Sequence, residues 1–144
     1  MTEISFHFNL PDRTQYVCRL LRKAVRQGVR VAVVGAQADL QSLDSALWAF
    51  SATDFVPHCV LGADAGVLSA SPVVLGGAPE QSRHHDVLLN LGAQVPAGFE
   101  RFARLIEVVG EDEEERVSSR RRWKYYRERG YSMVRHDQAR KESH

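Results

Sequence analysis

Residues 3–34 read EISFHFNLPDRTQYVCRLLRKAVRQGVRVAVV. Ile4, Phe6 and Phe8 occupy every second position, so they share one face of a predicted strand. Residues 29–34 form a compact apolar run rich in β-branched side chains, which is typical of a strand buried on both faces in a parallel sheet. The two strands flank an amphipathic helical stretch, and this order favours a right-handed βαβ unit.

The stretch between these strands has the signals of a complete helix. Asp12 can cap the first free amides, and Gly28 is well placed to end the helix. The inner, apolar stripe comprises Val17, Leu20, Leu21 and Ala24. The outer side carries Arg19, Arg22, Lys23 and Arg26.

The rest of the chain continues the alternation of strands and helices. Further strands are predicted at residues 59–61, 72–75, 86–91 and 105–109. Further helices are predicted at residues 39–50 with a stripe of Leu40, Leu43 and Leu47, from residue 96 with Phe99, Phe102 and Ala103 facing inward, and at 113–129 with Gly130 as C-cap. We therefore expect an α/β fold with a mostly parallel sheet in a single domain over residues 1–131, followed by a polar, flexible tail over residues 132–144.

Composition limits the class of protein. The chain has 144 residues and a formal net charge of +1, so we expect no global attraction to DNA or to a membrane. Cys18 and Cys59 stand among apolar residues without a CxxC spacing, which predicts buried free thiols in a reducing compartment. No signal peptide and no run of about 20 apolar residues is present. These features predict a cytoplasmic location and no membrane partner.

The turn after the second strand is the first place to look for a nucleotide site. It reads VVGAQADL (residues 33–40) with Gly35 as its one glycine, and neither GxGxxG nor GxxxxGK[ST] occurs in the chain. Without those glycines and that lysine the backbone has little means of cradling phosphates. A plain strand-to-helix turn is therefore favoured, and a nucleotide-dependent enzyme is the weaker alternative.

His84, His85 and Asp86 form a polar cluster ahead of a strand, where metal binding or general-base catalysis is conceivable. Adjacent histidines on a strand point to opposite faces, however, and no second group of ligands has matching spacing. No GxSxG motif occurs. We therefore expect no catalytic residue, no metal and no cofactor.

Residues 116–133, RVSSRRRWKYYRERGYSM, are the most informative segment. On a helix, one broad face would carry Arg116, Arg120, Trp123, Lys124 and Arg127. Such a surface suits an acidic peptide with one apolar anchor, or single-stranded nucleic acid that stacks on the indole. It could equally be a solvated basic helix with its aromatic residues packed on the sheet. The pattern alone leaves these readings open.

Several motifs, in one order along nearly the whole chain, resemble the chi subunit of bacterial DNA polymerase III. They are FHFNL (6–10), GVRVAVV (28–34), LDSALWAF (43–50), DFVPH (54–58), GGAP (76–79), SRHHDVLLNL (82–91), EVV (107–109) and RRWKYYRERGY (121–131). The resemblance implies a three-layer α/β/α, Rossmann-like fold without a phosphate loop. It also implies a non-catalytic adaptor that links the clamp loader, through a psi subunit, to the acidic C-terminal tail of single-stranded DNA-binding protein, which ends in Pro-Phe.

The resemblance also assigns residues to the tail site. By position, these are Arg116, Arg120, Trp123, Lys124 and Arg127, with Gly130 and Tyr131 just beyond. Arg120 would hold the terminal carboxylate and Trp123, where the family commonly has Tyr, would flank the Phe ring. The loop that supplies one apolar wall in the family is shorter here, and Val109 or Val117 would replace that wall.

A second surface is implied for the psi subunit. By position it comprises Trp48, Phe55, Val56 and Pro57. Simple core packing of these residues is the alternative, although so apolar a loop exposes more than a monomer usually tolerates. We expect direct binding of single-stranded nucleic acid to be weak or absent, because the net charge is only +1.

Overall fold

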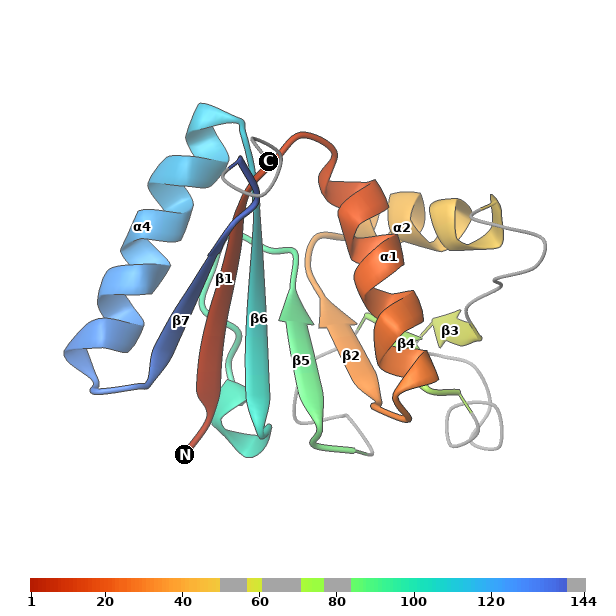
Figure 1. Cartoon of the computed structure of the whole chain (residues 1–144), viewed down its shortest axis with the longest axis horizontal. Helices are drawn as coiled ribbons and strands as arrows, with labels where there is room; N and C mark the ends of the chain where they lie inside the picture. Colours follow the sequence, from red (N-terminus) through yellow and green to blue (C-terminus); the bar gives the residue numbers. More distant parts are fainter. Residues whose placement is uncertain (50–56, 61–70, 77–83, 140–144) are drawn as a thin grey trace.

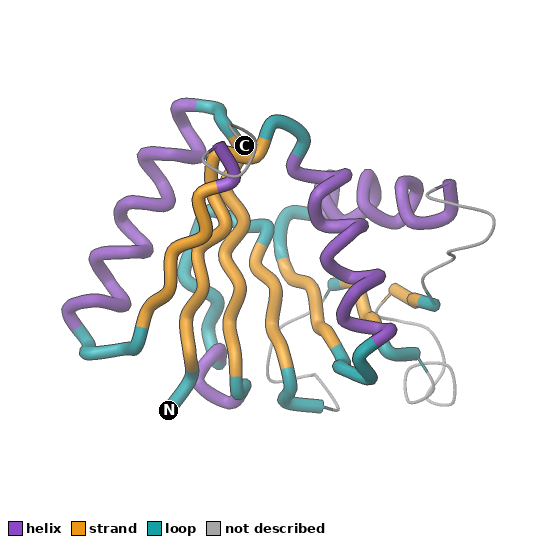
Figure 2. Tube along the Cα trace, viewed as in Figure 1, coloured by secondary structure: helices purple, strands orange, loops and turns teal. Residues whose placement is uncertain are grey.

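The computed structural model describes residues 1–49, 57–60, 71–76 and 84–139. Its seven strands form one sheet in the order β3-β4-β2-β5-β6-β1-β7, and every neighbouring pair is parallel (Figures 1 and 2). The strands are β1 (Glu3–Leu10), β2 (Val31–Val34), β3 (His58–Val60), β4 (Val73–Leu75), β5 (Val87–Asn90), β6 (Arg104–Gly110) and β7 (Met133–Asp137). The helices are α1 (Arg13–Arg26), α2 (Gln37–Ala49), α4 (Glu113–Glu128) and the 3₁₀ turn η2 (Phe99–Arg101).

Helices cover both faces of the sheet, which confirms the predicted three-layer α/β/α fold. One apolar cluster joins α1 and α2, through side chains such as Leu21 and Leu47, to one face. A second cluster joins α4 and η2, through Tyr126 and Phe99, to the other face. Figure 1 shows α1 in front of β2, and α4 beside β7 at the opposite edge of the sheet.

Strand β2 explains how one short apolar run serves both layers. All four of its residues are buried. Val31 and Val33 belong to the cluster under α1, whereas Ala32 and Val34 belong to the cluster on the α4 side. This alternation confirms the prediction of a strand buried on both faces.

Helix boundaries follow the predicted capping signals. The Asp12 side chain accepts a hydrogen bond from Gln15 N at the start of α1, and Asp112 accepts one from Glu115 N at the start of α4. Gly28 and Gly130, each just beyond a helix, have φ values of 73° and 78°, which glycine adopts without a steric penalty.

The prediction of a helix from residue 96 is wrong in length. Only one 3₁₀ turn forms, Phe99–Arg101, and it begins after Gly98, whose left-handed φ of 86° interrupts any helix there. Phe99 and Phe102 are buried as predicted, but Ala103 is exposed. The two phenylalanines are placed by the turn rather than by a helical stripe.

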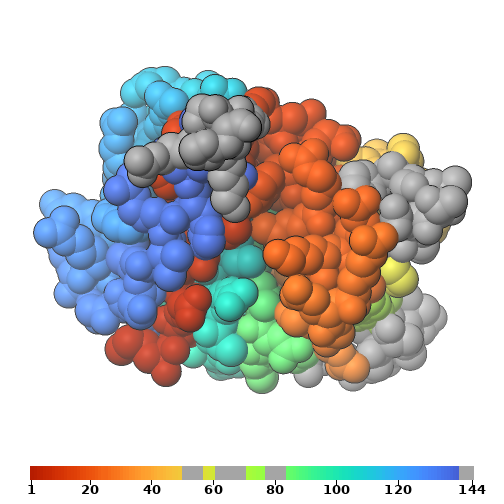
Figure 3. All heavy atoms as spheres, in the orientation of Figure 1, coloured from red at the N-terminus to blue at the C-terminus, as the bar shows by residue number. Residues whose placement is uncertain are grey.

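The chain after Ser132 differs most from expectation. The sequence predicted a polar, flexible tail from this point, but Met133–Asp137 form β7, which pairs in parallel with β1. The edge strand lies on the outer surface beside α4 (Figure 3). Residues 133–137 therefore belong to the same sheet as the rest of the chain, because tertiary pairing overrides their polar composition.

Both cysteines are buried free thiols, as predicted. Burial raises the pKa of Cys18 to about 11, so its thiol stays protonated at neutral pH. Within the described ranges, no helix is long and apolar enough to cross a membrane.

Candidate peptide-binding pocket

A buried polar network fixes α4 on the sheet. Glu107 of β6 is fully buried and accepts hydrogen bonds from Arg122 Nε at 3.0 Å and from the Tyr126 hydroxyl at 2.6 Å. Asn90 Nδ2 of β5 donates to the same carboxylate at 3.1 Å. Every donor in this network approaches one carboxylate, so the rotation of α4 about its axis is set by specific contacts as well as by packing.

Burial is the largest influence on the pKa of the Glu107 carboxyl group. Desolvation raises the pKa of Glu107, and the adjacent Arg122 guanidinium opposes that shift. Burial and the Glu107 carboxylate together raise the pKa of Tyr126, so its hydroxyl remains a donor. The network therefore contributes structure: it points Arg122 and Tyr126 inward and leaves the adjacent face of α4 to line a pocket.

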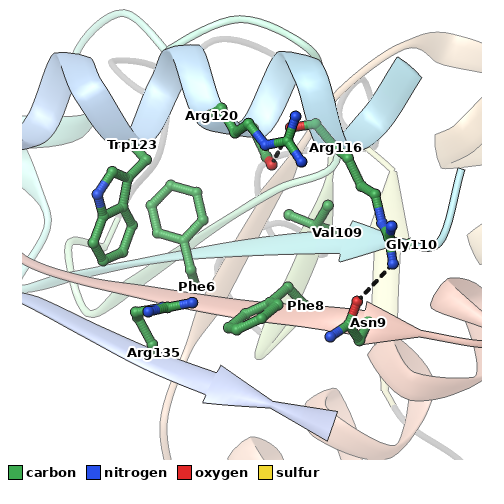
Figure 4. Close-up of a pocket in the computed structure, with 10 residues that line it drawn as sticks. Phe6, Phe8, Asn9, Val109, Gly110, Arg116, Arg120, Trp123 and Arg135 are labelled. Carbon is green, nitrogen blue, oxygen red and sulfur yellow. Dashed lines mark hydrogen bonds between the residues drawn. The ribbon is translucent and has the colours of Figure 1, made fainter. Parts of the chain in front are cut away.

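That adjacent face, together with three strands, encloses a pocket of about 500 Å³ (Figure 4). Residues from α4, β1, β6 and β7 line it: Phe6, Phe8, Asn9, Val109, Gly110, Arg116, Ser119, Arg120, Trp123 and Arg135. The α4 residues recur at helical spacing, one turn apart along the same side of the helix. The pocket therefore depends on the packing of α4 against β1.

The floor of the pocket is apolar and aromatic. Phe6 and Val109 are buried, and the Trp123 indole lies edge-on to the Phe6 ring with centroids 5.1 Å apart. Phe8 extends the floor towards the end of β1 (Figure 4). Such a surface can bury an apolar or aromatic side chain of a ligand, with a gain of about 25 cal/mol for each Å² of apolar surface removed from water.

Arg116 is held at one end of the pocket. Its Nη2 donates to Asn9 Oδ1 at 3.0 Å, and Asn9 Nδ2 donates to Asp137 Oδ1 at 2.9 Å. Asn9 has a φ of 59°, a left-handed conformation that asparagine tolerates better than most residues. The Asn9 amide thus ties α4 to β7 across the end of β1 and orients Arg116.

Arg120 and Arg135 are the other two positively charged residues that line the pocket. Arg120 is exposed on α4, and Arg135 is exposed on β7. Across the part of the chain that the structure describes, no carboxylate forms an ion pair with either guanidinium. An apolar floor bordered by cations that have no acidic partner among the described residues suits an anionic ligand that also carries an apolar group.

The structure brings together some of the residues that the sequence assigned to this site. Arg116, Arg120 and Trp123 line the pocket, and Val109, one of two suggested apolar walls, lies there as well. Val117, the other suggestion, lines a different groove.

The remaining assigned residues lie outside the pocket. Lys124 points to solvent with its Nζ 3.9 Å from Glu128, and Arg127 is exposed. Gly130 follows the last turn of α4, and the Tyr131 ring packs on Phe99 with centroids 5.2 Å apart.

The third reading of the basic segment, aromatic residues packed on the sheet, holds for part of α4. Tyr126 is fully buried, while Trp123 and Tyr131 are partly buried against the same cluster. The Trp123 ring therefore packs against Phe6 and also lines the pocket (Figure 4).

Sequence reasoning missed the strand residues of the pocket. Phe6 and Phe8 were assigned only to one face of a predicted strand, and Asn9 and Arg135 were not singled out. Residues 133–137 (MVRHD) show no alternation of apolar and polar side chains, so the sequence carries no clear strand signal for Arg135.

The other predicted surface is partly described. Trp48 on α2 is 65% exposed and its ring lies edge-on to His58, whose Nε2 is 3.0 Å from Asp44 Oδ1. Pro57 is exposed. Trp48 is therefore not packed in the core, which removes the alternative reading for that residue. Phe55 and Val56 lie outside the described residues.

The candidate sites for other chemistry gain no support. A Cβ on Gly35 would lie 2.9 Å from Leu91 Cβ, so this glycine permits close packing of the β2 turn against the end of β5. His84 and His85 both lie edge-on to the Phe102 ring. No group of three or more potential metal ligands occurs among the described residues.

The fold and the pocket define an α/β protein with a parallel sheet and a small cationic, aromatic pocket between a helix and the sheet edge. A family model described as "DNA polymerase III chi subunit, HolC" matches residues 1–134. The DNA polymerase III subunit chi of Pseudomonas aeruginosa is 35% identical over 142 residues, which cover 94% of this chain and 96% of the relative. The chi subunit of Escherichia coli is 29% identical over 122 residues, covering 83% of this chain and 81% of the relative. The chain belongs to the DNA polymerase III chi subunit family, whose members are accessory subunits in DNA replication.

Proposed function

We propose that this chain is a non-catalytic replication adaptor whose α4 pocket binds the acidic C-terminal tail of single-stranded DNA-binding protein. The observation that carries the proposal is the position of Arg120, an arginine without an acidic partner among the described residues, at the rim of an apolar aromatic floor. A tail that ends in Pro-Phe offers both complementary groups at its terminus.

In this proposal each group in the pocket has a separate role. The Arg120 guanidinium donates paired hydrogen bonds to the terminal carboxylate, because its planar fork matches carboxylate geometry. Phe6, Val109 and Trp123 enclose the terminal aromatic ring. Arg116, oriented by Asn9, adds positive potential at the far end of the pocket. Recognition therefore requires a free C-terminus next to an apolar side chain.

The binding is expected to be modest in affinity and sensitive to salt. The guanidinium of Arg120 is exposed, so its attraction to the peptide is screened over about 10 Å at 0.1 M salt.

A second surface around Trp48 would join the protein to the clamp loader through a psi subunit. The large exposed indole of Trp48 supports this assignment, because tryptophan is enriched among the residues that contribute most to protein–protein interfaces. Helix α2, which carries Trp48, and α4 cover opposite faces of the sheet, so this arrangement leaves room for both partners at once. We expect the adaptor to act in the cytoplasm.

The test is the binding of a fluorescent acidic peptide that ends in Pro-Phe, measured by anisotropy. Arg120→Ala and amidation of the peptide's C-terminus should each weaken binding about tenfold or more, the scale of a lost charge-assisted contact. Arg121→Ala is the matched control, because Arg121 is exposed on α4 but lines the groove on the other side of the helix. Binding that ignores both the amidation and Arg120→Ala would refute the proposal.

Direct binding of single-stranded nucleic acid is the other outcome to measure. The Trp123 ring is only partly exposed and rests on Phe6, whereas a stacking platform presents a free ring face. An electrophoretic shift with oligo-dT alone should therefore be weak or absent.

A further inference from the structure

Strand β7 brings a cation to the pocket that the helix cannot supply. In the parallel pairing of β7 with β1, Arg135 is the partner of Phe6, between the pairs Ile4–Met133 and Phe8–Asp137. Paired residues of adjacent strands lie on the same face of a sheet, and here that face is the one covered by α4. Arg135 therefore faces the pocket because of strand register, and it approaches from the side opposite to Arg120 (Figure 4).

Two aromatic rings hold the Arg135 side chain in place. Its guanidinium carbon lies 5.1 Å from the centroid of the Phe8 ring and 5.8 Å from that of Trp123. Cation–π contacts of this kind occupy the faces of the planar guanidinium and leave its N–H groups available at the edges. The side chain is thus partly preorganised, which lowers the entropy cost of binding an anion.

The nearest acid on the same strand face is already engaged. Asp137 Oδ1 accepts hydrogen bonds from Asn9 Nδ2 and from Ala139 N, both within 3.0 Å. No ion pair joins Asp137, or any other carboxylate of the described ranges, to Arg135. Within the described ranges, Arg120 and Arg135 thus place guanidinium groups without acidic partners on opposite sides of the aromatic floor of the pocket.

We propose that Arg135 forms a second anion subsite, which binds a carboxylate side chain upstream of the terminal residue of an acidic peptide. The inference rests on the proposed function: the single terminal carboxylate occupies Arg120, and the terminal aromatic ring lies on the floor between the two arginines. A second negative charge on the same peptide then meets Arg135. The upstream part of the peptide leaves the pocket over β7, so the protein selects acidic tails over neutral tails with the same last residue.

A double-mutant cycle between protein and peptide tests the subsite. Two peptides with the same Pro-Phe terminus are compared, one with upstream Asp residues and one with Asn at those positions. Arg135→Ala should lower the affinity for the acidic peptide about fivefold, which is the scale of a partly exposed ion pair. It should change the affinity for the neutral peptide by less than about twofold. Arg121→Ala, which removes the same charge outside the pocket, should affect both peptides equally and slightly.

Arg135→Gln serves as a second variant, because it keeps most of the side-chain stem that packs against Phe8 and should give the same charge-specific loss. Equal loss for the acidic and neutral peptides, or no loss for either, would overturn the subsite. Weakening by amidation and by Arg120→Ala without coupling to Arg135 would overturn this inference and leave the proposed function intact. A protein that binds neither peptide would overturn both.

Discussion

The two faces of the sheet are covered by different chemistry. The side under α1 and α2 is filled with aliphatic residues and the Cys18 thiol, and the side under α4 contains phenylalanines, tyrosines and the Glu107–Arg122 ion pair. The aliphatic side can pack in many equivalent ways, whereas hydrogen bonds to one carboxylate allow a single placement of α4. The comparison indicates that the face that needs a precisely placed helix, because it forms the pocket, is the one with directional contacts.

The largest effect is expected at the centre of the α4 side. Glu107→Ala leaves Arg122, which is 5% exposed, as a buried charge without its carboxylate, and should lower the free energy of unfolding by about 4 kcal/mol. Urea denaturation measures it. The double variant Glu107→Leu/Arg122→Met should recover part of that loss, because an apolar pair of similar volume replaces both charges while the buried Tyr126 hydroxyl loses its acceptor.

Measuring how the double variant binds the tail peptide separates the effect on protein stability from the effect on the placement of α4. At a temperature where the double variant is fully folded, it should bind the peptide more weakly than the wild type, because α4 has lost its directional contacts. A double variant with normal affinity would contradict the idea that the network places the pocket.

A smaller loss of stability, with no loss of binding, is expected on the aliphatic side. Leu21 is fully buried on α1, and Leu21→Ala should cost about 3 kcal/mol through lost burial and a residual cavity. At a temperature where the variant is fully folded, its affinity for the tail peptide should equal that of the wild type. A large change in affinity would show that packing under α1 also determines the shape of the pocket, and would contradict the idea that the contacts of α4 alone place it.

The smallest effect is expected at the end of β1. Asn9→Gly keeps the left-handed backbone but removes the amide that orients Arg116, so the free energy of unfolding should change by less than about 1 kcal/mol while peptide binding weakens about threefold. Asn9→Ala should bind similarly but be less stable by about 1 kcal/mol, because alanine is strained at a φ of 59°. Equal affinity for Asn9→Gly and wild type would show that Arg116 needs no such support.

The sequence predicted the layers well because their signals are local. The shared face of Ile4, Phe6 and Phe8 and the capping by Asp12 each depend on residues close together in the chain, and the structure confirms both. The helix predicted from residue 96 failed because the conformation of one residue, Gly98, outweighed an apolar pattern.

Only part of the pocket could be predicted from the sequence, for a different reason. Arg116, Arg120 and Trp123 share a helix and could be grouped by spacing, whereas Arg135 and Asn9 reach the pocket through the pairing of β1 with β7, strands about 130 residues apart in the chain. Lys124 and Arg127 have the right residue type, but helical spacing alone did not show where β1 meets α4.

The two tryptophans of the chain offer the most direct test, because Trp123 lines the pocket and Trp48 is exposed on α2 across the sheet. Trp48→Phe leaves Trp123 as the sole indole, and Trp123→Phe leaves Trp48. Titration with an unlabelled acidic peptide ending in Pro-Phe should give a saturable change in emission from the Trp48→Phe protein and none from the Trp123→Phe protein. A response from Trp48, with Trp123 silent, would place the peptide on the other surface and contradict the account.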